Sequence, residues 1–114
     1  MRLCRNNERM MDMAKPNIFA FADEASKQMP GQIEAMLRNG LNGLEIRGVD
    51  GENVSVISVE KAAKVRKMMD DNGLRVWSVG SPIGKIKIAD DFEAHLETYR
   101  HTLEIAHILG AENI

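Results

Sequence analysis

The sequence has 114 residues, of which 15 are basic and 17 acidic, and a formal net charge of −2. This length suits one domain, and the balanced charge excludes a basic surface of the kind that binds nucleic acid or an anionic membrane. With no run of about 18 apolar residues, no apolar signal-peptide core and a single cysteine, Cys4, we expect a cytoplasmic protein.

Residues 1–16 show no apolar periodicity, and we predict that they form a flexible N-terminal extension. Regular patterning begins at residue 17 and continues to residue 114, which defines one domain. Its first element is the compact apolar run 18–22, which is typical of a buried strand. Asp23 and Glu24 follow this strand directly and form an acidic loop.

A helix is predicted after this loop, because Pro30 suits a first helical position and Gly40 provides a stop. The segment 43–47 then reads as a short strand whose side chains alternate between two faces. Leu44 and Ile46 occupy the apolar face, and the other face carries Glu45 and Arg47.

The polar, glycine-bearing segment 48–54 is predicted to be a loop. Ser58 is a suitable N-cap for the next helix, which we expect to end at Gly73. The segment 74–79 is a third strand, and we expect its Trp77 to pack between the sheet and the helices.

A longer third helix is predicted to begin after Asp90 or Asp91 and to end at Gly110. Residues 111–114 look like the start of a fourth strand. The helix is expected to bury one apolar side made of Phe92, Leu96, Tyr99, Leu103 and Ala106.

Strands that alternate with glycine-ended helices predict an α/β fold with a parallel sheet. The turn after the first strand, 23–27, is acidic and has no glycine, so it does not match a phosphate-binding turn of a nucleotide-binding sheet.

Polar side chains gather just past the ends of the three strands, and in a parallel barrel these ends form one rim. The candidate substrate-binding residues are Asp23, Glu24, Glu45, Arg47, Ser81 and Lys85. Arg47 could hold a carboxylate or phosphate through two parallel hydrogen bonds, Lys85 could offer a point charge, and Glu45 could hold hydroxyls. His95, His101 and His107 lie six residues apart and are interpreted as surface residues, and no residue is assigned as a catalytic group or a metal ligand.

Several of these segments resemble the sugar phosphate isomerase/epimerase group of the xylose isomerase-like TIM barrels. The resemblance covers residues 17–114 and rests on the segments 43–47, 53–54, 72–74, 81–85 and 106–114. It implies the N-terminal half of a (β/α)8 barrel, about three and a half βα units, from an enzyme that acts on a sugar or sugar phosphate. The reaction it implies is a metal-assisted proton transfer next to a carbonyl.

The sequence departs from the family in two respects, and these limit the functional residues that the resemblance can assign to this chain. No histidine stands at the end of the third strand, where the sequence reads Gly80-Ser81-Pro82, and the later strands that supply the divalent metal ligands are absent. We therefore expect a truncated product or a half that needs a partner, inactive and without bound metal when alone. Its open sheet edges would favour self-association.

Two alternatives remain open at this point. One is a non-catalytic module that binds a sugar or a sugar acid through Arg47 and Lys85. The other is a flavodoxin-like signalling domain, although an acceptor aspartate is missing where Gly80 and Ser81 stand.

Overall fold

The computed structural model describes residues 15–114, so nearly all of the predicted N-terminal extension lies outside the described residues. The described chain is α/β. Its parallel sheet has the order β1 (Phe19–Ala20), β2 (Gly43–Ile46), β5 (Arg75–Val79). The helices that connect and follow these strands are α2 (Met29–Arg38), α3 (Val59–Asp71) and α4 (Phe92–Leu109).

Short elements fill the connections that follow β1 and β2. The 3-10 helix η1 (Ala22–Glu24) occupies the predicted acidic loop. The predicted loop after β2 contains the antiparallel pair β3 (Gly48–Val49) and β4 (Glu52–Asn53), followed by the 3-10 helix η2 (Val54–Val56). The first strand is consequently shorter than predicted, because the chain turns into η1 directly after Phe21.

Helix ends lie where the sequence places them. The Ser58 side chain accepts a hydrogen bond from the Lys61 backbone N–H at the start of α3. Asp91 does the same for Glu93 at the start of α4. Gly110 ends α4 in the left-handed conformation, at φ 73°, which glycine adopts without the clash that a Cβ would cause.

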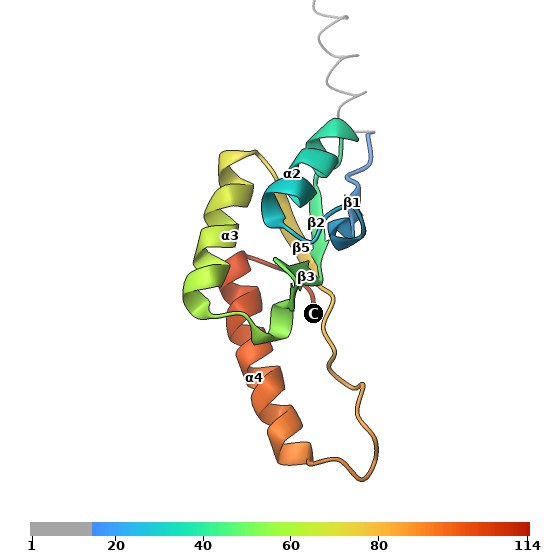
Figure 1. The fold of residues 1–114 in the computed structure, drawn as a ribbon, viewed down its shortest axis with the longest axis vertical. Coiled ribbons are helices and arrows are strands. Elements are labelled where there is room, and N and C mark those ends of the chain that lie inside the picture. Colours follow the sequence, from blue (N-terminus) through green and yellow to red (C-terminus); the bar gives the residue numbers. More distant parts are fainter. Residues whose placement is uncertain (1–14) are drawn as a thin grey trace, which may run out of the picture.

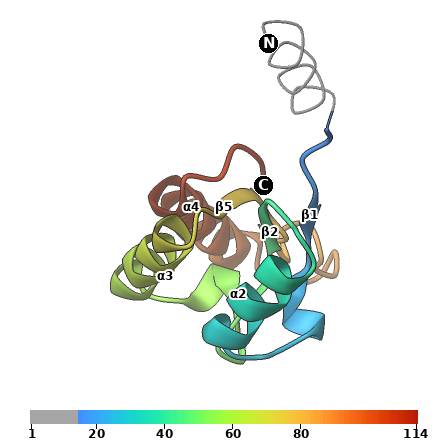
Figure 2. The ribbon, with the colours of Figure 1, turned by 90° about the horizontal axis from the view of Figure 1, so that it is seen from above.

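Each strand of the parallel sheet lies beside the strand of that sheet that follows it in the chain, so the sheet has no reversal of order. Figures 1 and 2 show α2, α3 and α4 along one face of this sheet. Residues 112–114 extend the sheet on the far side of β5, because Val79 N–H donates to Asn113 O at 2.9 Å and Ser78 bridges Asn113 in parallel. The predicted start of a fourth strand is therefore present.

The core lies between the sheet and the helices. Leu44, Ile46 and Val76 project from the sheet into it and are at most 3 % exposed. Methionine fills much of the remaining space, because its unbranched side chain adapts to irregular gaps. The largest core side chains from the helices are Met29, Met36, Met69, Ile105 and Leu109.

Within residues 15–114, no helix or strand covers the second face of the sheet. The Phe19 and Trp77 rings stack on this face with centroids 5.6 Å apart, although β2 lies between their strands. Gly43 stands between Phe19 and Arg75 in the register of the sheet, and a Cβ at this position would clash with the Arg75 backbone. Trp77 is 38 % exposed, so the prediction that it packs between sheet and helices is wrong.

The predicted buried side of α4 is only partly right. Ala106 is buried and Leu96 is half-buried, but Phe92, Tyr99 and Leu103 are between 37 % and 61 % exposed. The buried residues of this helix are Thr102, Ile105, Ala106 and Leu109. Both sets have helical spacing, and the choice between them depends on how α4 packs against α3 and η2. The first turns of α4 extend past the sheet in Figure 1, and residues 91–94 are exposed. None of the helices within residues 15–114 combines the length and the apolar character needed to cross a bilayer.

Candidate functional site

The candidate site lies at the carboxyl ends of β1 and β2. Asp23 follows β1, and Arg47 is the first residue after β2, so the parallel pairing of these strands brings the two side chains together. Arg47 Nε donates to Asp23 Oδ2 at 2.8 Å, and Arg47 Nη2 donates to Asp23 Oδ1 at 2.9 Å. The result is a two-point ion pair between residues 24 positions apart in sequence.

Two more side chains contact Arg47. Glu24 Oε1 accepts a weaker hydrogen bond from Arg47 Nη2 at 3.4 Å. On the uncovered face of the sheet, the Arg47 guanidinium lies 4.4 Å from the centre of the Phe21 ring, within reach of a cation–π contact. Arg47 is therefore fixed by two carboxylates and an aromatic ring.

These contacts set the protonation states of the pair. The hydrogen bonds from Arg47 lower the pKa of Asp23 below 3.8, against the opposing effect of its partial burial. The same hydrogen bonds to Asp23 raise the pKa of Arg47 further above its ordinary value. At neutral pH the site holds a charged carboxylate and a charged guanidinium.

The β3–β4 hairpin forms one wall of the site. Asp50 and Gly51 form its two-residue turn, with φ 50° and φ 86°, as a type I′ turn requires. Gly48 allows close approach, because a Cβ at this position would lie 3.0 Å from the Asp23 side chain.

Asp50 ties this hairpin to two helices. Its Oδ1 accepts a hydrogen bond from Met29 N–H at the start of α2, and its Oδ2 lies 2.7 Å from Lys61 Nζ of α3. The hydrogen bond with Lys61, followed by that from Met29, lowers the pKa of Asp50. Gln32 adds a hydrogen bond from α2 to the Gly48 carbonyl at 2.9 Å. These contacts with α2 and α3 hold the hairpin in place beside the ion pair.

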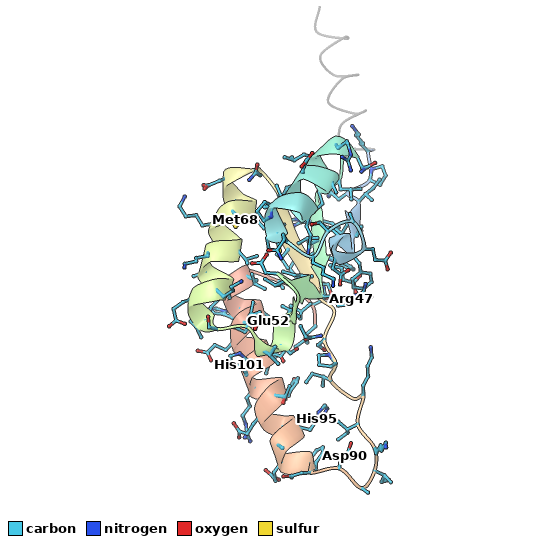
Figure 3. All side chains as sticks on the ribbon, viewed as in Figure 1. Arg47, Glu52, Met68, Asp90, His95 and His101 are labelled. Carbon is cyan, nitrogen blue, oxygen red and sulfur yellow. The ribbon has the colours of Figure 1, made fainter. Side chains whose placement is uncertain are left out.

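A cleft of about 320 Å³ opens between the ion pair and the hairpin. Its lining combines both signs of charge with an amide and open backbone, which suits a polar ligand with several hydroxyls better than an apolar one. The lining residues are Asp23, Lys27, Arg47, Gly48, Gly51, Glu52 and Asn53. Figure 3 shows Arg47 and Glu52 near each other beside the hairpin.

The structure brings together only part of the predicted site. Glu45 lies on the same face of β2 as Arg47, opposite the buried Leu44 and Ile46, and it is half-buried. Of the predicted site residues, Asp23 and Arg47 line the cleft, and Glu24, Glu45, Ser81 and Lys85 do not.

Ser81 and Lys85 belong to the connection between β5 and α4. This connection is tied to the start of α4, because Gly84 N–H donates to His95 Nε2 at 2.9 Å. Figure 3 shows His95 toward the end of the molecule remote from Arg47. The Lys85 side chain is exposed there, away from the ion pair.

Two of the three histidines are not the exposed surface residues that the sequence analysis predicted. His95 accepts the hydrogen bond from Gly84, and His101 Nε2 lies 2.8 Å from the Ile57 carbonyl, so both are half-buried and hold backbone in place. Only His107 is exposed as predicted. In the described part of the chain, no group of three His, Cys, Asp or Glu side chains is arranged to hold a metal ion.

Sequence reasoning missed Lys27, Glu52 and Asn53 as lining residues. The Asp50-Gly51 dipeptide is a strong hairpin signal and could have placed Glu52 opposite Val49. Lys27 has no comparable signal, because the turn of η1 brings it to the cleft.

Comparisons of the chain with protein family models, with curated proteins and with solved structures found no match.

Proposed function

We propose that residues 17–114 form the N-terminal part of a xylose isomerase-like (β/α)8 barrel that binds a sugar or sugar phosphate. In a complete barrel this part would contribute substrate-binding groups to an isomerisation or epimerisation. The order of the strands supports the proposal: each parallel strand neighbours the next in sequence, and the connecting helices cover one face. A doubly wound sheet would instead place its first strand in the interior, whereas β1 lies at the edge.

The observation that carries the proposal is the Asp23–Arg47 pair at the carboxyl ends of two adjacent strands, beside a polar cleft. Barrel enzymes build their sites at these strand ends. Each Asp23 oxygen already accepts a hydrogen bond from Arg47. Arg47 Nη1 makes no hydrogen bond within residues 15–114, so it can donate to a hydroxyl or a phosphate oxygen of a ligand. Lys27 and Asn53 supply further donors across the cleft.

The divalent metal that the resemblance implies does not fit at Asp23 or Asp50. Both oxygens of Asp23 accept hydrogen bonds from Arg47, and Asp50 is occupied by Met29 and Lys61. A cation at either carboxylate would have to displace a cationic side chain. We therefore assign no metal ligand and no metal-dependent step to this part of the chain.

Glu45 is the carboxylate we assign to substrate hydroxyls. It shares the uncovered face with Arg47 and has no ion-pair partner within residues 15–114, so its oxygens remain available as acceptors. Ser81 follows Gly80, whose N–H donates to Ile46 O at 2.7 Å, so Ser81 lies near the end of β2 and Arg47. Lys85 would reach the same ligand if the β5–α4 connection left its position beside His95.

Ligand binding to matched arginine variants tests the proposal. Arg47→Gln removes the cleft guanidinium, whereas Arg75→Gln removes an arginine of the same face that stacks on Phe19 and pairs with Glu112 outside the cleft. We expect pentoses and hexoses, with and without a terminal phosphate, to shift backbone NMR signals of residues around Gly48 and Gly51.

Arg47→Gln should weaken this binding about 10-fold or more, the loss typical of one charge-assisted hydrogen bond, and Arg75→Gln should change it less than about twofold. Absence of binding by every sugar, or equal losses in both variants, would contradict the proposal.

The second candidate is a module that binds a sugar acid without proton transfer. The free Nη1 donors of Arg47 favour it, because a carboxylate can take them without any metal. Titration with aldonic acids in the presence of a chelator separates the candidates. Binding that persists in chelator and prefers the acid over the neutral sugar favours the module.

A further inference from the structure

The connection between β5 and α4, residues 80–90, is hydrogen-bonded to other elements at two points. Gly80 N–H donates to Ile46 O at 2.7 Å, and Gly84 N–H donates to His95 Nε2 at 2.9 Å. Within the described chain, every other hydrogen bond of this connection joins positions at most three residues apart. Most of the connection is exposed. The contact with His95 therefore fixes its middle part beside α4.

This contact depends on the charge of His95. A backbone N–H can only donate, so His95 Nε2 is the acceptor, and the ring is neutral with its proton on Nδ1. Protonation would place a second N–H at Nε2, facing the N–H of Gly84, and the hydrogen bond would be lost. His101 differs, because its Nε2 lies 2.8 Å from the Ile57 carbonyl and can donate to it whether the ring is neutral or charged. A change of charge thus breaks the contact of His95 but not that of His101.

The charged and titratable groups around His95 come from α4 and from the connection. Asp91 and Tyr99 lie one turn before and one turn after it on the helix, and Lys85 follows Gly84 in the chain. α3 and η2 pack against α4, whose buried residues lie in its later turns. Histidine is the side chain that ordinarily changes charge between pH 5 and pH 8, so mild acid addresses this contact.

The start of the connection lies against the candidate site. A Cβ at Gly80 would be 2.8 Å from Phe21 Cε1 and 3.5 Å from Arg47 Cβ. Lys85 follows Gly80 by five residues, and an extended chain of that length spans about 16 Å. A connection released from His95 can therefore rotate about Gly80 and bring Lys85 back toward Arg47.

Exposed apolar side chains in two places favour this movement. Ile86 and Ile88 are exposed in the connection, and Ile88 is fully so. Phe21 and Trp77 are exposed on the uncovered face of the sheet. Contact between the two groups would remove apolar surface from water, which is favourable. The hydrogen bond from Gly84 opposes this contact, because it keeps the connection beside α4.

We propose that residues 82–90 form a lid for the candidate site, which neutral His95 holds beside α4 and which protonation of His95 releases onto the cleft. The released lid would add the positive charge of Lys85 to the side of the cleft that carries Arg47. The benefit to an anionic ligand such as a sugar phosphate rests on the proposed function, whereas the movement itself needs no ligand.

Hydrogen exchange of the Gly84 amide tests the contact with His95. Its protection factor should fall about fivefold between pH 7.5 and pH 5.5, the change typical of one neutral hydrogen bond. His95→Gln offers an acceptor that does not titrate, so its Gly84 protection should stay constant. His95→Ala offers no acceptor and should show low protection at both pH values. His107→Gln, which changes an exposed histidine, should behave as the unmodified chain.

A spin label measures whether the released connection reaches the site. In a Cys4→Ser background the label is attached at Lys85→Cys, and the backbone NMR signal of Gly51, on the cleft wall, is recorded. This signal should broaden at pH 5.5 and not at pH 7.5, and adding His95→Ala should broaden it at both. A label at Val56→Cys, on η2, should have the same effect at both pH values.

Several outcomes would overturn the lid. One is equal Gly84 protection at the two pH values in the unmodified chain, and another is an equal fall in His95→Gln. A third is loss of protection without broadening at Gly51, because the connection would then leave α4 without covering the cleft. Sugar binding by a chain that shows no such movement would overturn the lid and leave the proposed function intact. Movement in a chain that binds no sugar would support the lid and contradict the proposed function.

Discussion

Asp23 and Arg47 show how one pair of side chains defines the candidate site. Two hydrogen bonds shorter than 3 Å hold the carboxylate against the guanidinium, and Gly48 leaves room for the contact. Neither residue has a fixed place on sequence grounds alone, because an exposed acid and an exposed base are ordinary surface residues. They become candidate site residues because the fold places them in contact.

The lowered pKa of Asp23 makes this contact pH-dependent. Since its pKa in the folded chain lies below the ordinary 3.8, the ionised pair stabilises the fold above about pH 4. This contribution is lost as the pH falls through the lowered pKa. We expect Asp23→Asn to reduce the free energy of unfolding at pH 7 and to have progressively less effect below about pH 4.

Urea unfolding of both proteins between pH 2.5 and pH 7 measures this difference. Glu34→Gln is the control, because Glu34 makes only an exposed 3.9 Å contact with Arg38. A difference between Asp23→Asn and the unmodified chain that is constant across this range would contradict the assigned pair.

At the scale of the elements, glycines end the helices in the left-handed conformation. Gly40 and Gly110 have φ 67° and φ 73°, but their surroundings differ. A Cβ at Gly40 would meet nothing within 4 Å, whereas a Cβ at Gly110 would lie 2.3 Å from Arg66 Nη1. Arg66 also donates to the Ile108 carbonyl near the end of α4, where a cation is favourable.

These two glycines form a matched pair of substitutions. Gly40→Ala should cost about 1 to 2 kcal/mol for the positive φ alone. Gly110→Ala should cost more, because Arg66 must also move. Thermal unfolding measures both. Equal losses would show that Arg66 does not pack against Gly110 in solution.

The orientation of α4 leads to a second prediction at this scale. Ile105 is fully buried and Leu103 is 41 % exposed, although the sequence favours the side of the helix that carries Leu103. Ile105→Ala should therefore cost about 2 to 5 kcal/mol, as for a large core side chain. Leu103→Ala should cost less than about 1 kcal/mol, because little of it leaves an apolar environment.

Urea unfolding of the two variants measures these losses, with circular dichroism confirming that α4 remains helical. The reverse order, with Leu103→Ala the more damaging, would mean that α4 packs through its other side.

At the scale of the whole molecule, the sheet is covered on one face and open on the other. Trp77, the single tryptophan, reports on the open face, where it stacks against Phe19 and is 38 % exposed. In the single chain, acrylamide should quench its fluorescence readily. Weak quenching, as for a buried indole, would contradict an open face at Trp77.

Stern–Volmer measurements on the folded chain test this prediction, with the urea-unfolded chain as the reference for a fully exposed indole. The quenching constant of the folded chain should be a substantial fraction of the value for the unfolded chain.

The sequence by itself determined the α/β class, the places where helices begin and end, and the alternation of Leu44 and Ile46 with Glu45 and Arg47. These features depend on neighbours in the chain: caps, glycines and the two-residue period of a strand. Asp91 and Gly110, for example, bound α4 through contacts within about four residues.

Only the tertiary structure decided which polar residues meet and which apolar side of α4 is buried. Asp23 reaches Arg47 because β1 and β2 pair in parallel, and Lys85 is held away because Gly84 binds His95. Trp77 lies on the uncovered face of the sheet, where its ring stacks on Phe19 from across β2. Contacts of this kind join residues distant in the chain, and no local pattern records them.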